Sequence, residues 1–333
     1  MRHHPAALQG KKKSILTYIS VVALLFLLST GHALAKTYRI LIVSSGSSAI
    51  YTDMIDTLQT AVTNSAVLRE TNTQVAFTVE FLNGTAATVP LREKARQQDL
   101  LLTIGQGAIA TTAEISPSLP IIATLIPKQT YDHYRAALRK ANIKSTAIFI
   151  DNPPERQIAL ARLLLGNSQK LGVLIGENSP QGEIESALQK MGSSYHIETV
   201  KRTDNLISKL SYVLSDTDVF MAFPDAQIFN RDTAKNILLT TYRQRTPVIA
   251  YSASYVKAGA LAAVYSTAQQ IAEQTADTLV RILASGLNFP EQGSYPKYFE
   301  IAINRNVAKS LVIPVSSETE IKDQLLKILE KTQ

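Results

Sequence analysis

The sequence predicts an α/β protein made of two doubly wound units, each built on a mostly parallel sheet. Short apolar runs rich in Val, Ile and Leu alternate with amphipathic stretches, the pattern of buried parallel strands followed by helices. This alternation occurs twice along the chain, in units of about 110 residues each. The 333 residues include no cysteine, so the core must hold the fold without disulfides.

The first unit begins with Tyr38 to Val43, a near-continuous run of Ile, Leu and Val that predicts a strand buried on both faces. The small polar residues 44–48 predict a turn that leads into a helix at 49–62. The further elements expected here are, in order, a strand at 75–81, a helix at 91–97, a strand at 100–104, a helix at 108–114 and a strand at 120–125.

The second unit repeats the alternation. Its expected elements are strands at 145–150, 170–175, 196–200, 218–223 and 247–251, and helices at 154–165, 183–191, 206–214 and 229–243. Pro154 stands at the first position of its helix, where a missing N–H costs nothing. The remaining chain predicts a strand at 260–264, a long amphipathic helix at 267–283, a strand at 298–303 and a terminal helix at 321–330.

The first 35 residues have the composition of a secretory signal peptide. Arg2 and the lysines at 11–13 precede a mostly apolar run at 15–28, and Ala33-Leu34-Ala35 is a cleavage pattern. The apolar run is shorter than the roughly 20 residues of a spanning helix, although an uncleaved anchor is the alternative. We therefore expect cleavage after Ala35, a periplasmic location and no membrane insertion afterwards. No cysteine follows the run to carry a lipid.

Charge argues against nucleic acid as a partner. The chain has a net charge of +7, but its first 35 residues hold four of the 34 basic residues and none of the 27 acidic ones. The remainder is close to neutral, and its basic residues are dispersed rather than gathered into a patch.

The sequence offers little for catalysis, for a metal or for a cofactor. Three of the five histidines lie in the first 35 residues, which leaves His133 and His196. His196 begins an expected strand and is interpreted as structural, and two separate histidines without cysteine make no zinc site. No G-x-S-x-G elbow, phosphate-binding loop or dinucleotide fingerprint is present. We expect a binding protein and not an enzyme.

Polar loops at the carboxyl ends of the expected strands are the candidate ligand site, because open α/β sheets bind ligands there. Serines and glycines before helices offer anion donors on one side, and acids and tyrosines lie on the other, which suits a small zwitterionic or polar organic ligand held between two lobes. Ordinary helix caps and tight turns are the alternative interpretation. The candidates are Ser45, Ser47, Ser48, Tyr51, Gly105, Gln106 and Gly107 in the first unit, and Asp151, Glu177, Asn178, Ser179, Asp225, Tyr251 and Tyr255 in the second.

Four segments in the right order carry a family resemblance. They are DLLLTIGQG at 99–107, KLGVLIGENS at 170–179, VKAGALAA at 256–263 and YFEIAINRNVAKSL at 298–311. The chain resembles the periplasmic solute-binding proteins of ABC importers, in the subfamily with tryptophan- and tyrosine-type binding components. The match spans most of residues 37–315.

The resemblance implies two lobes joined by a three-crossover hinge, as in type I periplasmic binding proteins. One lobe would hold 37–146 plus about 265–290, and the other 147–264 plus about 291–333. It also implies an amino-acid-like solute, bound between the lobes and delivered to an ABC permease and ATPase. A sensor that signals to a histidine kinase or receptor is the alternative. Residues 125–128 lack the acid that many relatives carry there, and Trp is absent, so an aromatic amino acid is not carried over as the ligand.

Overall fold

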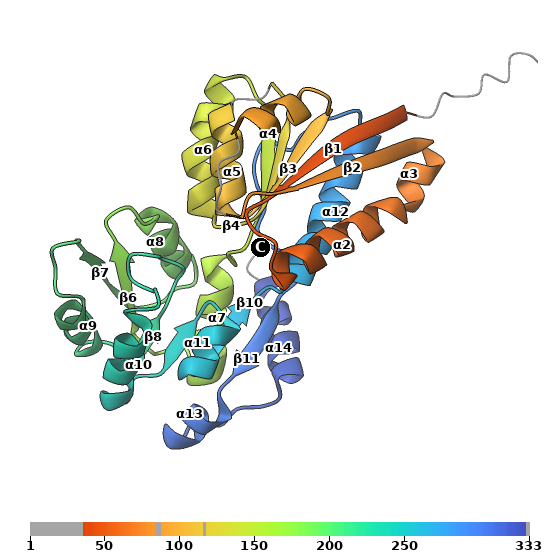
Figure 1. The fold of residues 1–333 in the computed structure, drawn as a ribbon. Coiled ribbons are helices and arrows are strands. Elements are labelled where there is room, and N and C mark those ends of the chain that lie inside the picture. The colour runs from red at the N-terminus through yellow and green to blue at the C-terminus, as the bar shows by residue number, and fades with distance from the viewer. Residues whose placement is uncertain (1–35, 84–87, 116–117, 331–333) are drawn as a thin grey trace, which may run out of the picture.

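The computed structural model describes residues 36–83, 88–115 and 118–330, so the predicted signal peptide lies outside the described residues. The chain folds around two separate sheets, each covered by helices on both faces (Figure 1). We call each sheet with its covering helices a lobe. This confirms the predicted α/β class with two doubly wound units.

The first sheet is entirely parallel, with strand order β2-β1-β3-β4-β5. Its strands are β1 (Lys36–Ser44), β2 (Thr73–Phe81), β3 (Leu100–Ile104), β4 (Ile121–Ile126) and β5 (Ser145–Phe149). The helices between them are α2 (Ala49–Thr63), α3 (Ala66–Glu70), α4 (Thr88–Ala95), α5 (Gln106–Ile115) and α6 (Lys128–Lys140).

The second sheet has strand order β11-β10-β9-β8-β6-β7 and is parallel except for the pair β10 and β11. Its strands are β6 (Leu171–Gly176), β7 (Tyr195–Val200), β8 (Val219–Met221), β9 (Val248–Ala250), β10 (Ala262–Tyr265) and β11 (Glu300–Ile303). The helices in this part of the chain are α7 (Pro154–Leu165), α8 (Gln181–Lys190), α9 (Leu206–Leu214), α10 (Ala234–Arg243), α11 (Ala253–Ala258), α12 (Ala268–Ala284), α13 (Arg305–Ser310) and α14 (Glu318–Glu330).

Residues 40–43 of strand β1 are all apolar because they are buried on both faces of the sheet. Ile40 and Ile42 pack with α2 and with the distant helix α12, while Leu41 and Val43 pack with α4 and α5 on the opposite face. Alternate side chains of a strand point to opposite faces, so a segment that is buried on both faces needs apolar side chains at successive positions. Helix α12 therefore belongs to the first lobe although it follows β10 of the second sheet (Figure 1).

The structure corrects several predicted elements. The helix expected at 229–243 begins only at Ala234, because residues before it form turns fixed by Asn230 and Thr233 side chains. The strands expected at 218–223 and 247–251 are shorter, at three residues each. Helices α3, α6, α11 and α13 were not predicted.

Three chain segments connect the two sheets, and hydrogen bonds join them into one node. Asn152 Nδ2 donates to Ser266 Oγ at 3.2 Å, and Ser266 Oγ donates to the carbonyl of Tyr298 at 2.7 Å. Arg156 Nη1 donates both to Asn152 Oδ1 at 2.8 Å and to the carbonyl of Pro296 at 2.7 Å. We call these five residues the hinge node, since they link the first, second and third crossovers.

The third crossover also docks on the edge of the first sheet. Ser294 accepts a hydrogen bond from Phe149 N–H at 3.0 Å and donates to the carbonyl of Ala147 at 2.8 Å. The buried Gln274 of α12 donates to the carbonyl of Tyr295 at 3.0 Å and accepts from Lys297 N–H at 2.6 Å. Backbone groups of this irregular segment are thus paired with neighbours on both sides.

Replacing Gly293 by alanine is expected to lower the free energy of unfolding by about 1–3 kcal/mol, as overpacking does. A Cβ atom there would lie 2.4 Å from Phe149 Cζ. The Phe149 ring cannot move aside, because it is buried between Tyr131 and Tyr295. Urea unfolding measures the change. Gly182→Ala in α8 is the control, with no atom within 4 Å of its new Cβ, and should be neutral or stabilising. Equal stability of the two variants would contradict the packing argument.

Candidate functional site

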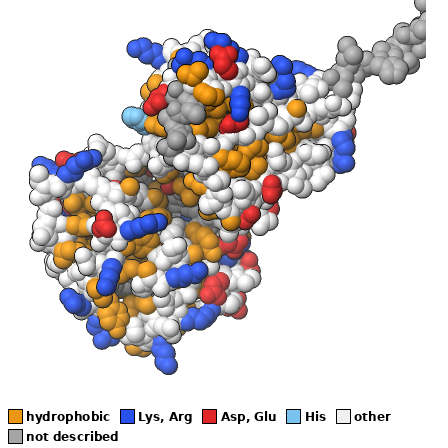
Figure 2. Space-filling model, in the orientation of Figure 1, with side chains coloured by type: hydrophobic (Ala, Val, Ile, Leu, Met, Phe, Trp, Pro, Cys, Tyr) orange, Lys and Arg blue, Asp and Glu red, His pale blue; other side chains and the backbone are white. Residues whose placement is uncertain are grey.

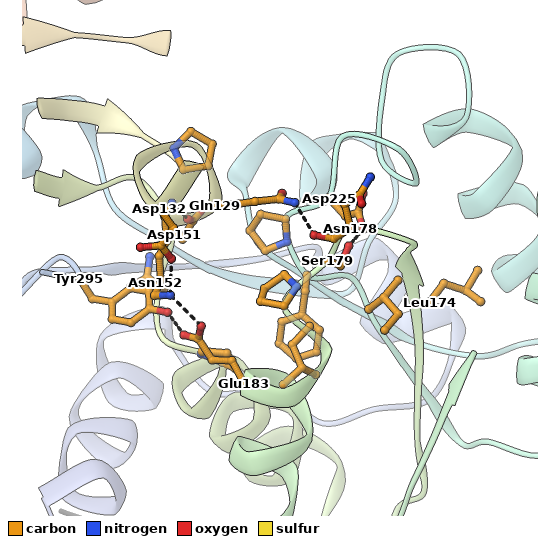
Figure 3. Close-up of a pocket in the computed structure, with 18 residues that line it drawn as sticks. Gln129, Asp132, Asp151, Asn152, Leu174, Asn178, Ser179, Glu183, Asp225 and Tyr295 are labelled. Carbon is orange, nitrogen blue, oxygen red and sulfur yellow. Dashed lines mark hydrogen bonds and ion pairs between the residues drawn. The ribbon is translucent and has the colours of Figure 1, made fainter. Parts of the chain in front are cut away.

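A cavity of about 270 Å³ lies where the carboxyl ends of strands from both sheets meet the first and third crossovers. It is lined by the start of α6, the crossover before α7, the ends of β6 and β8, the start of α8, and Tyr295 (Figure 3). Figure 2 shows the molecule hollowed between its two halves. This is the place at which open α/β sheets bind ligands, and the volume is near the lower end for small-molecule sites.

Four of the sequence-predicted residues line this cavity: Asp151, Asn178, Ser179 and Asp225. They come from the first crossover and from the loops after β6 and β8. The first crossover and the loops after β6 and β8 therefore meet at one cavity. Glu177, which was also predicted, does not line the cavity, and its Oε2 accepts a hydrogen bond from Arg202 N–H at 3.3 Å.

Asp225 is held by protein donors on both of its oxygens. Oδ2 accepts from Gly176 N–H at 2.7 Å and from the Ser179 hydroxyl, and Oδ1 accepts from Gln227 N–H at 2.8 Å. The side chain therefore joins the β6 and β8 loops to each other. Asp225 shapes the cavity wall, and Ser179 shares its hydroxyl with the same network.

Asp151 is the carboxylate with the most strongly perturbed environment in the cavity. Its Oδ2 accepts from Lys128 N–H at 2.5 Å, so it caps the first turn of α6 across the chain. Burial raises the pKa of the Asp151 carboxyl from 3.8 to about 6, an effect that this hydrogen bond only partly opposes. A partly buried acid with a raised pKa in a cleft is a candidate for a functional group.

Residues that sequence analysis did not select complete the cavity and join the lobes. Lys128 Nζ contacts Glu183 Oε2 at 3.1 Å, the Tyr295 hydroxyl donates to the same carboxylate, and Gln129 Nε2 donates to the carbonyl of Asn178 at 2.6 Å. Lys128 and Gln129 start α6, Glu183 lies in the first turn of α8, and Tyr295 is in the third crossover. The available signal for the residues of α6 and α8 was the proline that precedes each helix, Pro127 and Pro180.

The hydroxyl of Ser45 makes its hydrogen bonds within the protein. Its hydroxyl donates to the carbonyl of Ile104 at 3.0 Å and accepts from Ala108 N–H at 2.9 Å, which satisfies the first turn of α5. Gly105 must be glycine here, because it has a φ of +86° and a Cβ would lie 2.7 Å from Ser45 Oγ and 3.2 Å from the Tyr51 ring. Ser45, Gly105 and Tyr51 thus build the loop rather than line the cavity.

Ser45→Ala is expected to lower the free energy of unfolding by about 1 kcal/mol, the usual cost of losing a helix cap. The Ala108 N–H would lose its acceptor while remaining partly buried. Ser47→Ala is the matched control, because Ser47 lies two residues further along the chain and is exposed. This substitution should change the free energy of unfolding by less than about 0.5 kcal/mol. Denaturant unfolding of the two variants distinguishes them, and equal stability would contradict the capping role.

Ser47, Ser48, Gln106 and Gly107 are exposed at the starts of α2 and α5 and do not line the cavity. Ser48 is the N-cap residue of α2, and its side chain makes no capping hydrogen bond. The predicted anion donors of the first lobe are therefore accessible, but the structure does not bring them into the cavity with Asp151.

Tyr251 and Tyr255 line a second hollow of about 410 Å³, beside Phe229. The two tyrosine rings lie 5.3 Å apart between centroids, and Phe229 is 6.1 Å and 5.9 Å from them. Burial raises the pKa of Tyr251, and the neighbouring Tyr255 and the carboxylates Asp151 and Asp225 raise it further. The cavity acids therefore act electrostatically on Tyr251, although neither tyrosine lines the cavity.

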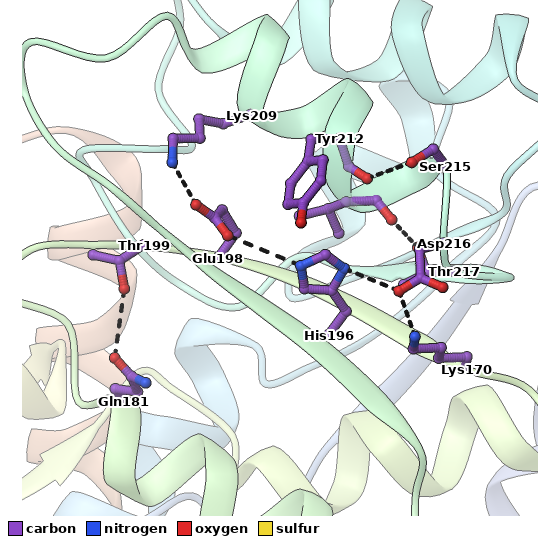
Figure 4. Close-up of polar contacts among 11 residues, drawn as sticks. Lys170, Gln181, His196, Glu198, Thr199, Lys209, Tyr212, Ser215, Asp216 and Thr217 are labelled. Atoms are coloured by element: carbon purple, nitrogen blue, oxygen red, sulfur yellow. Dashed lines mark hydrogen bonds and ion pairs between the residues drawn. The ribbon is translucent and has the colours of Figure 1, made fainter.

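His196 lies in an ionic cluster on β7, away from the cavity (Figure 4). Its Nδ1 is 3.4 Å from Asp216 Oδ2 and its Nε2 is 3.9 Å from Glu198 Oε2. Lys170 pairs with Asp216, and Lys209 with Glu198. Within the described part of the chain, no group of three or more His, Cys, Asp or Glu residues could hold a metal ion.

Comparisons with known proteins place the chain in a family. The family model described as ABC transporter substrate binding protein matches residues 48–325. No curated protein matches the sequence. Among residues 36–83, 88–115 and 118–330, no helix has the length and apolar character to cross a membrane.

Three solved structures share the fold. One is an ABC domain in complex with L-Trp from Streptococcus pneumonia, at 18% identity and a TM-score of 0.53, covering 86% of this chain and 98% of that one. Another is the ligand-free, open structure of CD0873, a substrate binding protein with adhesive properties from Clostridium difficile. It has 16% identity and a TM-score of 0.61, and the match covers 84% of this chain and 96% of that one. The third is a XylFII-LytSN complex mutant, at 12% identity and a TM-score of 0.55, and the match covers 82% of this chain and 99% of that one.

The fold is thus that of type I-like periplasmic binding proteins, as the sequence predicted. The matched family consists of solute-binding proteins and not of enzymes, which agrees with the absence of catalytic motifs from the sequence. The family model covers most of the chain, including all three crossovers and every strand except β1. The protein belongs to the ABC transporter substrate binding protein family.

Proposed function

We propose that the protein captures a small polar organic solute, amino-acid-like in size, in the cavity between its lobes and delivers it to an ABC permease and ATPase. The location would be the periplasm. One observation supports this best: the cavity is built jointly by both sheets and by the crossovers, with a partly buried carboxylate at its wall. A ligand there contacts both lobes at once, so closure of the lobes can report its presence.

The proposed lobes are 37–146 with about 265–290, and 147–264 with about 291–333. The packing of α12 on the first sheet and the pairing of β11 with β10 support this division. Ser294 pairs with β5, so the third crossover is better placed at about 295–299 in this proposal. Rotation of the lobes would then occur around the hinge node.

A thermal-shift screen of the purified protein with a broad metabolite panel tests the capture of a small solute. A ligand present at a hundredfold its Kd should stabilise the folded protein by about 2.7 kcal/mol. Asn178→Trp places a large ring at an exposed position of the cavity wall and should reduce the shift. Asn236→Trp, exposed on α10, should retain the shift. No shift with any metabolite, and no small molecule in native mass spectra, would refute the proposal.

A sensor is the second candidate, because XylFII in the XylFII-LytSN complex has a similar fold. In that case the closed lobes would bind a histidine kinase or receptor instead of a permease. Uptake of the identified solute into cells with and without the gene distinguishes the two. Loss of uptake supports transport, whereas unchanged uptake together with a lost transcriptional response supports sensing.

A further inference from the structure

The charge of the cavity wall is strongly unbalanced. Its described lining residues include four carboxylates, Asp132, Asp151, Glu183 and Asp225, and one ammonium, that of Lys128. No arginine is among these lining residues. A ligand that enters the cavity therefore meets an excess of negative charge in a partly desolvated space, where charge is felt more strongly than in water.

The ammonium group of Lys128 is already paired with two carboxylates of the protein. Its Nζ lies 2.7 Å from Asp132 Oδ2 and 3.1 Å from Glu183 Oε2. Burial acts to lower the pKa of Lys128, but the hydrogen bonds to these two carboxylates outweigh it and the pKa is raised. The lysine is thus a fixed cation between two acids. A carboxylate on the ligand would find no unpaired cation at this wall.

Asp151 is the acid that lacks a full set of partners. One oxygen accepts from Lys128 N–H, and among the described residues no donor is paired with the other oxygen. The side chain is on the cavity wall near Tyr295 and Glu183 (Figure 3). Asp151 is partly buried, and a carboxylate that has lost much of its water is stabilised by hydrogen bonds or an opposite charge, so a cationic donor from the ligand would complete its coordination.

The uncharged part of the wall is mostly apolar, and its four polar members are Gln129, Asn152, Asn178 and Ser179. Leu174, Ile175, Ile184 and Phe223 line it together with four prolines. Tyr295 adds an aromatic ring, and burial together with its bond to Glu183 and the charge of Asp151 raises its pKa, so its hydroxyl stays protonated. Such a wall suits a hydrocarbon body that carries one charged end.

We propose that the cavity selects a small organic ammonium ion, which pairs its charge with Asp151 and packs its apolar body on the opposite wall, over the corresponding amino acid. This inference rests on the proposed function and narrows its ligand class. The α-carboxylate of an amino acid would add a second negative charge to a wall that already has three in excess. The exposed donors at Ser48 and Gly107 lie outside the cavity and do not offset it.

Matched pairs of ligands that differ only by the α-carboxylate test the inference. Isothermal titration calorimetry compares 2-phenylethylamine with L-phenylalanine, 3-methylbutylamine with L-leucine, and agmatine with L-arginine, alongside uncharged 2-phenylethanol. For at least one pair we expect the amine to bind at least tenfold more tightly than the amino acid, and 2-phenylethanol to bind more weakly than 2-phenylethylamine.

The protein variants are Asp151→Asn and the control Asp277→Asn, which is exposed on α12 outside the cavity. Asp151→Asn should weaken binding of the amine at least tenfold, and Asp277→Asn should leave it unchanged; circular dichroism checks that both variants fold. Amino acids that bind as tightly as their amines, or an Asp151→Asn variant with unchanged affinity, would overturn this inference and leave solute capture intact. If no compound of these pairs or of the metabolite panel binds, both proposals fail.

Discussion

Asp151→Asn is expected to make the unliganded protein more stable at neutral pH, on the order of 1–3 kcal/mol. Burial raises the pKa of this carboxyl from 3.8 to about 6. At neutral pH the folded protein therefore holds an ionised group that water would solvate better in the unfolded chain. Asparagine removes the charge and keeps an oxygen that can accept the Lys128 N–H.

The pH dependence of this gain has a definite sign. Between pH 3.8 and about 6 the folded state retains a proton on Asp151 that the unfolded state has already released. The contribution of Asp151 to stability therefore falls as pH rises through this interval and stays low above it. The gain of Asp151→Asn over wild type should be smallest near pH 4 and reach its full size above about pH 6.

Urea unfolding of both proteins across this pH range measures the difference. Asp132→Asn is the control, because its exposed carboxylate pairs with Lys128 and its removal should give no gain. A gain for Asp151→Asn that does not depend on pH would contradict the proposed cause. A higher stability combined with weaker ligand binding would show that the cavity carries an acid for function at a cost to folding.

Arg156→Ala is expected to lower the free energy of unfolding by about 2–4 kcal/mol, because Asn152 Oδ1 and the carbonyl of Pro296 would lose their donor. The guanidinium also lies 4.7 Å above the Phe299 ring, and that contact would be lost. Burial lowers the pKa of Arg156 to about 10, so it remains charged at neutral pH.

Two further variants separate the hinge role of Arg156 from a general loss of charge. Arg156→Lys keeps the positive charge but not the planar guanidinium with its several donors. Its free energy of unfolding should lie between those of wild type and Arg156→Ala. Arg92→Ala, exposed on α4, should change stability by less than about 0.5 kcal/mol. Denaturant unfolding compares all three. If Arg92→Ala and Arg156→Ala had the same effect, the hinge node would not be a source of stability.

The strands were predictable because their sequences carry the signal of burial on both faces, as in β1, β3 and β6. Helix α6 was missed for the opposite reason. Among its thirteen residues only Tyr131 and Leu138 are buried and most of the others are polar, so the apolar stripe that identifies an amphipathic helix is narrow. The short helices α11 and α13 are set by side-chain caps at Ser252 and Asn304, which a hydrophobic pattern does not reveal.

The candidate site was predictable to the extent that it follows from strand ends. Asp151, Asn178, Ser179 and Asp225 were found in this way. The sequence could not show that the Ser45 hydroxyl is already used by Ala108 N–H, because that bond joins residues 63 positions apart. Nor could it place Tyr295 beside Glu183, which requires knowing where the third crossover docks.

The position of α12 has a consequence for the order in which the protein folds. One face of the first sheet is covered by Ile271, Leu279 and Ile282, which pack on Ile40 and Ile42. A ribosome synthesises these residues more than 200 positions after β1. The first sheet therefore exposes part of its apolar face until residue 284 has been made, although domains usually fold as they emerge. The amino-terminal lobe begins first and is completed after most of its partner lobe has been synthesised.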